Sequence, residues 1–199
     1  MQMEGMHAMG MNATELAVGL FRVLETGDPV LAAEVVHEEF HNREAAVAPP
    51  ACRIAGPAGV LASSVWMRSA FDGLKLPFLE TIHNDDQVWV RLRMQGRHTG
   101  AFVLFKDGAV DQVVPPTGRE IDFEQIHVLD LRDGKVIRHE AVRDDITMLG
   151  QLGVFPPTPA AGMRMITWRA TGRAARAAAE VMTQTAQAAA TLPHVSTDA

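Results

Sequence analysis

Residues 119–145 read REIDFEQIHVLDLRDGKVIRHEAVRDD, which predicts two long strands joined at Asp133-Gly134. This dipeptide favours a two-residue hairpin, because such a turn needs positions that tolerate positive φ. Strand side chains alternate between the two faces of a sheet, so Gln125 and His127 share an otherwise apolar face of the first strand. The apolar members of that face are Ile121, Phe123, Leu129 and Leu131.

Gln125 and His127 are open to two interpretations. In an ordinary core they hydrogen-bond to each other or to the backbone, whereas in a pocket they face a molecule that enters. An unpaired buried polar group costs roughly 1–3 kcal/mol, so both interpretations require partners. Two such residues on one face, followed by a carboxylate pair at the end of the next strand, lead us to interpret this face as the wall of a pocket.

The carboxylate pair is Asp144 and Asp145, and strand alternation places one of them on each face. Val142 lies on the same face of the predicted strand as Asp144, which favours Asp144 as the inward residue, although the charged Arg138 and Glu140 lie on that face as well. Asp145 then suits the N-cap of a helix that begins at Ile146. We expect Asp145 to cap this helix and Asp144 to react.

The composition is that of an ordinary globular protein, with 47% hydrophobic and 21% charged residues among 199. A net charge of −6 argues against a nucleic-acid-binding surface. No apolar run approaches the roughly 20 residues that span a bilayer, and the first residues lack a secretory signal. Cys52 is the single cysteine, which fits a reducing compartment. We therefore expect a cytoplasmic protein with no nucleic-acid or membrane partner.

The first third of the chain predicts helices. Their expected spans are 13–25, 28–36 and 57–71, from apolar residues at helical spacing. Gly27 supplies the first stop, and Asp28-Pro29 supplies an N-cap and a first helical position for the second helix. The segment 40–44 is polar and is expected to lead into a loop.

After Asp72-Gly73 the hydrophobic period changes from 3.6 to 2. Strands are expected at 76–82, 88–94 and 101–105 and in the central hairpin, and the turn-rich residues 106–118 are expected to form a loop. Helices followed by a run of antiparallel strands indicate an α+β domain. We predict a strongly curved antiparallel sheet covered by the N-terminal helices, a cone whose mouth is a natural small-molecule site.

These patterns divide the chain into three parts. Residues 1–11 are expected to be a disordered leader, and residues 12–155 to form the domain. Residues 156–199 combine a proline-rich linker with an alanine-rich helical extension.

Four segments resemble one known family: FHNREA (40–45), GRHTGAF (96–102), PPTGREIDFEQIHVLDLRDGKVIRHEAVRDD (115–145) and ITMLGQLG (146–153). They are similar to the SnoaL-like polyketide cyclases, also called ester cyclases, of the nuclear transport factor 2-like superfamily. The resemblance spans about residues 12–155. It implies an α+β cone, a homo-oligomer, no metal and no organic cofactor. It also implies ring closure of a polyketide by intramolecular aldol condensation with an aspartate base.

The resemblance also assigns roles to residues. Asp144 falls on the position of the base, seven residues before Gln151, and Gln125 and His127 fall on the pair that flanks the substrate oxygen. The positions expected to line the pocket are Asn42, Trp66, Trp89, His98 and Phe123. The chain has no tyrosine, so its tryptophans and Phe123 would supply the aromatic rings.

The expected function is thus cyclisation of a small hydrophobic substrate that contains carbonyl groups. A hydrolase or isomerase of similar shape and a binding protein without chemistry are the alternatives. Ile126 and Val128 lie on the outer face of the predicted hairpin, where a monomer would expose them. We therefore expect a homo-oligomer, a dimer or tetramer, with a dimer formed through the sheet.

Overall fold

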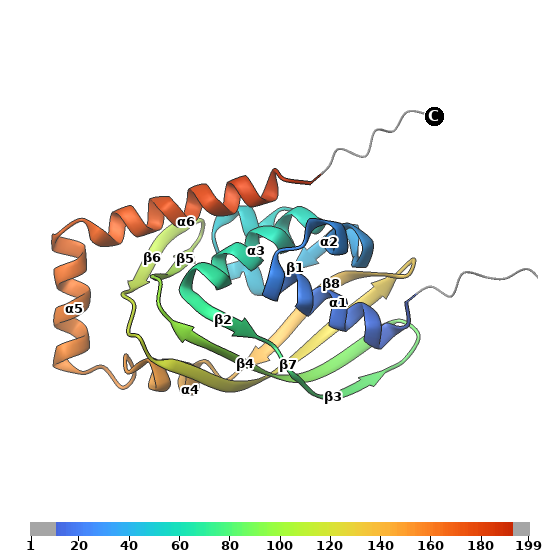
Figure 1. The fold of residues 1–199 in the computed structure, drawn as a ribbon, viewed down its shortest axis with the longest axis horizontal. Coiled ribbons are helices and arrows are strands. Elements are labelled where there is room, and N and C mark those ends of the chain that lie inside the picture. Colours follow the sequence, from blue (N-terminus) through green and yellow to red (C-terminus); the bar gives the residue numbers. More distant parts are fainter. Residues whose placement is uncertain (1–10, 193–199) are drawn as a thin grey trace, which may run out of the picture.

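The computed structural model describes residues 11–192, in which helices lie over the concave face of a curved sheet (Figure 1). The helices are α1 (Ala13–Thr26), α2 (Pro29–Val35), α3 (Pro57–Ala70), α4 (Asp145–Leu152), α5 (Pro159–Ala170) and α6 (Arg173–Ala189), with the short 3-10 helices η1 (Arg43–Val47) and η2 (Pro50–Arg53). The strands are β1 (Val36–Asn42), β2 (Phe71–Lys75), β3 (Phe78–His83), β4 (Gln87–His98), β5 (Phe102–Lys106), β6 (Ala109–Val114), β7 (Glu120–Arg132) and β8 (Lys135–Arg143).

The predicted α+β class is confirmed. The main sheet runs in the order β1-β8-β7-β4-β2, with β3 also paired to β4. Helix α1 begins with a capping box between Asn12 and Glu15 and ends at Gly27, whose left-handed φ of 73° suits glycine. Its buried face includes Leu20 and Phe21 and packs against the sheet in the core. No helix among residues 11–192 is long and apolar enough to cross a membrane.

Two strands lie where the sequence predicted none, and these expectations are corrected. The polar segment 40–44 begins within β1, which pairs in parallel with β8, so the sheet is not antiparallel at this edge. Backbone pairing and the buried Phe40 stabilise the strand, while Glu38, Glu39 and His41 are exposed. The turn-rich residues 106–118 contain β6, which forms a two-stranded hairpin with β5.

The β7–β8 hairpin contains a one-residue bulge. Leu131 lies opposite Val136, as a turn at Asp133-Gly134 requires, but the next pair is Asp130 with Arg138, which leaves Ile137 as the extra residue. A one-residue slip transfers every later side chain to the opposite face of the sheet. The parity that we assigned to β8 from the sequence is therefore wrong beyond this point.

Exposure of the side chains in β8 agrees with the shifted register. His139 is 6% exposed and faces inward, whereas Val142, which we expected to face inward, is 76% exposed. The odd-numbered residues from His139 to Arg143 therefore turn toward the helices, and the even-numbered residues of this part of β8 turn toward the outer face.

The C-terminal extension forms the expected alanine-rich helix. Helix α6 lies along α3 and beside the β5–β6 hairpin, and α5 stands roughly perpendicular to it at the end of the molecule (Figure 1). Ala178, Val181 and Thr185 are the buried residues of α6, whereas α5 has none. Residues 1–10 of the predicted leader lie outside the described residues, as do residues 193–199 of the extension.

Shortening a buried side chain of α6 is expected to destabilise the whole protein. Val181 is 5% exposed, so Val181→Ala should lower the free energy of unfolding by about 1–3 kcal/mol through lost burial and a residual cavity. The neighbouring Met182 is 42% exposed, and Met182→Ala should change it by less than about 0.5 kcal/mol. Urea unfolding followed by circular dichroism checks both values. Equal values for the two variants would mean that α6 does not pack on the domain in solution.

Candidate active site

A cavity of about 210 Å³ lies between the concave face of the sheet and the helices that cover it. Its walls are mainly apolar and come from α1, α3, α4, η1 and the inner faces of the strands. Among the sequence-predicted residues, Asn42, Trp66, Phe123, Gln125 and His127 line it. A mainly apolar chamber with a few converging polar groups is the usual form of a small-molecule site.

Four polar side chains form one continuous chain along the cavity wall. Gln125 Oε1 lies 2.8 Å from His127 Nε2, and His127 Nδ1 lies 2.7 Å from His139 Nε2. His139 Nδ1 in turn lies 3.1 Å from Asn42 Oδ1. Both ring nitrogens of His127 are therefore occupied within the protein. The carbonyl-polarising role that we expected for His127 would need a free N–H, which this arrangement does not leave.

Burial keeps the two imidazoles neutral. It lowers the pKa of His127 well below the usual value, with further lowering from His139 and the Arg143 guanidinium. The pKa of His139 is lowered to about 4, again by burial first and Arg143 second. The Phe21 ring lies edge-on to His127, with ring centroids 4.8 Å apart, so α1 shields the pair from water.

Charged side chains meet at the rim of the cavity. Arg143 lies between Glu44 and Asp145, with its Nη1 3.5 Å from Glu44 Oε2 and its Nε 3.5 Å from Asp145 Oδ1. Glu44 is held in place because its Oε1 accepts a hydrogen bond of 2.9 Å from the Ala141 backbone N–H. Asp145 is about half exposed, and all three charged residues line the cavity.

Asp144 does not line this cavity, and the expectation that Asp145 caps the helix is wrong. Asp144 is the N-cap of α4, and its carboxylate accepts hydrogen bonds from the Thr147 backbone N–H and hydroxyl at 3.0 and 2.6 Å. The bond from the Thr147 hydroxyl, with that from the backbone N–H, lowers the pKa of Asp144. Asp145, which we expected to be the cap, follows it in the first turn and lines the cavity.

Of three further residues predicted to line the pocket, one lines the cavity and two do not. Trp66 lines the cavity while its indole N–H donates to the Val103 carbonyl oxygen at 2.9 Å. Trp89 is 49% exposed on the outer face of β4, so it does not line the cavity. His98 is buried at the end of β4, where its Nδ1 accepts from the Thr117 backbone N–H, and it is not among the lining residues either.

Sequence reasoning missed three residues of the site, namely Glu44, His139 and Arg143. His139 and Arg143 lie on β8 beyond the bulge, where alternation counted from the turn gives the wrong face, and Glu44 lies on η1, outside the strands that we predicted. The sequence contained one indication of the bulge. Uninterrupted alternation would turn Arg138 and Glu140 toward the core, where charged residues are almost never fully buried, so a register shift in β8 was to be expected.

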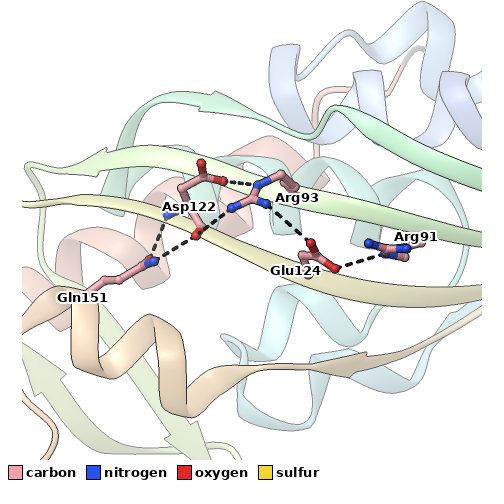
Figure 2. A network of polar contacts seen from close by, with 5 residues as sticks. All are labelled: Arg91, Arg93, Asp122, Glu124 and Gln151. Atoms are coloured by element: carbon pink, nitrogen blue, oxygen red, sulfur yellow. Dashed lines mark hydrogen bonds and ion pairs between the residues drawn. The ribbon is translucent and has the colours of Figure 1, made fainter.

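Helix α4 is fastened to the sheet by Gln151 (Figure 2). Its side-chain oxygen accepts from the Asp122 backbone N–H and its amide nitrogen donates to the Asp122 carbonyl oxygen, both at 2.8 Å. The last β8 residue paired with β7 is Arg143, so Gln151 replaces a strand at this edge. Around it, Arg93 pairs with Asp122 and Glu124 on the exposed face (Figure 2). These contacts fix where the first turn of α4, and hence Asp145, can lie.

Comparison with known proteins identifies relatives over the same part of the chain. A family model described as SnoaL-like polyketide cyclase matches residues 15–152. The chain is 32% identical over 146 residues to aklanonic acid methyl ester cyclase DnrD of Streptomyces peucetius, covering 73% of this chain and 93% of that protein. It is also 32% identical over 148 residues to aklanonic acid methyl ester cyclase DauD of Streptomyces sp. (strain C5), covering 73% and 84%.

Solved structures share the fold. TsrD from Streptomyces laurentii superposes with a TM-score of 0.59 at 21% identity, covering 73% of this chain and 99% of that one. IdmH from Streptomyces antibioticus superposes with a TM-score of 0.55 at 24% identity, covering 72% and 100%. The family model and the two cyclases extend over most of the domain, and the fold agrees with them: this chain belongs to the SnoaL-like polyketide cyclase family.

Proposed function

We propose that this protein closes a ring of a polyketide ester by intramolecular aldol condensation, with Asp145 as the general base. The observation that carries the proposal is the position of Asp145 beside Arg143 at the rim of an apolar cavity. A carboxylate and a guanidinium side by side supply both groups that carbon-acid chemistry needs, a base and a donor for the developing negative oxygen. Two relatives named aklanonic acid methyl ester cyclases suggest an aromatic polyketide ester as the substrate class.

The proposed reaction regenerates the base. Asp145 takes the proton from the carbon between a ketone and an ester carbonyl, and the electron pair of the C–H bond forms an enolate. The enolate carbon then attacks a second carbonyl carbon of the same molecule, which forms the ring bond and places the charge on that carbonyl oxygen. This alkoxide takes the proton back from Asp145 and becomes a hydroxyl group, so no other reactant is needed.

Arg143 is the proposed donor to the enolate oxygen. A guanidinium carries five N–H groups, and the contacts of Arg143 with Glu44 and Asp145 are all near 3.5 Å, so a closer acceptor can displace them. Donors aimed at a developing oxyanion are worth roughly 3–4 kcal/mol each in measured cases. Gln125 and His127, which we expected to fill this role, lie on the cavity wall and form part of the polar chain.

Replacing the two aspartates in turn tests the proposal, because each variant is the control for the other. Asp145→Asn keeps the shape and removes the base, so turnover of aklanonic acid methyl ester should fall by roughly 10²–10⁴-fold. Asp144→Asn should keep turnover within a few-fold, because asparagine caps a helix about as well as aspartate. Single-turnover kinetics on both variants, with ligand binding by calorimetry, measures these effects.

The opposite pattern, an inactive Asp144→Asn and an active Asp145→Asn, would exclude Asp145 as the base and place the chemistry on the capping residue. If both variants turned over as the wild type does, the carbon-acid mechanism itself would be refuted.

We also propose a homodimer through the outer face of the sheet. Ile82, Trp89 and Val128 lie opposite one another across β3, β4 and β7, and Ile126 lies opposite Val142. All of these except Val128 are exposed large hydrophobic residues, and they form an apolar strip. Arginines and carboxylates alternate beside it, as Figure 2 shows, so a second copy related by a two-fold axis offers complementary charges.

Sedimentation velocity is expected to give twice the chain mass of 21.6 kDa at micromolar concentration. Val142→Glu should shift the protein to the monomer, because a charge would be buried in the contact. Val30→Glu is the matched control, since Val30 is 72% exposed on helix α2 and lies outside the apolar strip. A wild-type monomer would refute the dimer.

A further inference from the structure

Asn42, at one end of the polar chain on the cavity wall, determines which atom donates in each hydrogen bond of the chain. Asn42 Oδ1 accepts a hydrogen bond of 3.0 Å from the Glu44 backbone N–H, at the start of η1. This contact fixes the oxygen, rather than the amide nitrogen, next to His139. The facing atom, His139 Nδ1 at 3.1 Å, must therefore carry a proton and donate it.

The remaining protons follow one by one. A neutral imidazole carries one N–H, so His139 Nε2 is an acceptor once its Nδ1 is the donor. His127 Nδ1, 2.7 Å away, must then be protonated, and His127 Nε2 becomes an acceptor in its turn. An acceptor nitrogen needs a donor opposite it, and among the described residues the group in hydrogen-bond contact with His127 Nε2 is the side-chain amide of Gln125.

We propose that the neutral His127–His139 pair turns the amide of Gln125 so that its nitrogen donates to His127 and its carbonyl oxygen faces the cavity. The site then selects ligands that bring a hydroxyl group, an enol or a phenol, to this point. His127, His139 and Asn42 are positioning residues, because they act on the ligand through Gln125. The proposal deepens the proposed function and rests on it for the choice of ligand class.

The opposite orientation, with Gln125 Oε1 at His127 Nε2, requires one additional proton on the imidazole pair. Each of the three contacts, Gln125–His127, His127–His139 and His139–Asn42, then has a proton of its own. The amide nitrogen of Gln125 lies 3.5 Å from Met94 Sδ in this orientation, facing the cavity. The two orientations differ by half a turn of one amide. Uptake of a proton by the imidazole pair therefore changes Gln125 from an acceptor to a donor toward the ligand.

The charges around the pair favour the neutral form. Arg143 on β8 lowers the pKa values of both imidazoles, Glu44 of η1 is drawn toward Arg143, and Asp145 of α4 pairs with the same guanidinium. Helix α1 contributes the uncharged Phe21. Because burial lowers the pKa of both imidazoles, the neutral pair and the acceptor form of Gln125 are favoured at neutral pH and are lost only on acidification.

Nitrogen NMR of the full chain without ligand tests the tautomers directly. At pH 7.5, long-range ¹H–¹⁵N spectra should show Nδ1 protonated and Nε2 unprotonated in both rings, with His127→Asn and His139→Asn used for assignment. A proton on Nε2 of His127, or a doubly protonated ring at this pH, would overturn the proposal. This readout needs no turnover, so it stands or fails independently of whether Asp145 is the base.

Binding of a matched ligand pair tests the consequence. β-Naphthol should bind the wild type about 5–30-fold more tightly than its methyl ether, because a buried acceptor left without a donor costs about 1–2 kcal/mol. Asn42→Asp keeps the acceptor for Glu44 and His139 but adds a negative charge that favours a protonated pair. Asn42→Asp should therefore remove most of the preference for β-naphthol at pH 7.5. On acidification, the variant should lose the preference at a higher pH than the wild type does.

Asn84→Asp is the matched control, because Asn84 also accepts backbone N–H groups in a turn, between β3 and β4, outside the cavity lining. It should leave the preference unchanged. Equal affinities of the two naphthalenes for the wild type, or an unchanged preference in Asn42→Asp, would overturn the selective role of Gln125.

Discussion

The bulge at Ile137 is the constraint on which the site depends. Between the turn and the bulge, β8 follows the register of a two-residue hairpin, and beyond it the strand is advanced by one residue. Without the bulge, Arg138, Glu140 and Val142 would face the helices. Burying two charges there would cost several kcal/mol even if they paired with each other. The bulge instead places both charges on the outer side, where Arg138 pairs with Asp130, and turns His139 inward to meet His127.

The inner face of β7 was predictable because alternation is uninterrupted there. Every second residue from Ile121 to Leu129 is buried, as the sequence pattern predicts, and this includes Gln125 and His127. The strand also runs through the middle of the sheet, so pairing on both sides keeps its register. Strand β1 has no such pattern. It lies at the edge, most of its residues are polar, and it exists because the backbone after α2 pairs with β8, a contact remote in sequence.

The two adjacent aspartates show why local preferences could not settle the site. Both positions suit the start of a helix, and aspartate is favoured at the cap and in the first turn alike. The choice is made by tertiary contacts: β8 ends its pairing at Arg143, and Gln151 holds α4 against the free edge of β7. The chain therefore turns at Asp144, whose carboxylate is occupied by Thr147, and the next carboxylate comes to lie at the cavity.

Polarity is distributed in the cavity according to the cost of desolvation. The deep wall holds imidazole and amide groups that form one chain and stay neutral, whereas Glu44, Arg143 and Asp145 lie at the rim, where each keeps some contact with water. Burying a neutral, hydrogen-bonded group costs far less than burying an ion. A ligand with a hydrophobic ring system therefore gains most by placing its rings inside, against Trp66 and Phe123. Its carbonyl groups then remain at the rim, next to Arg143 and Asp145.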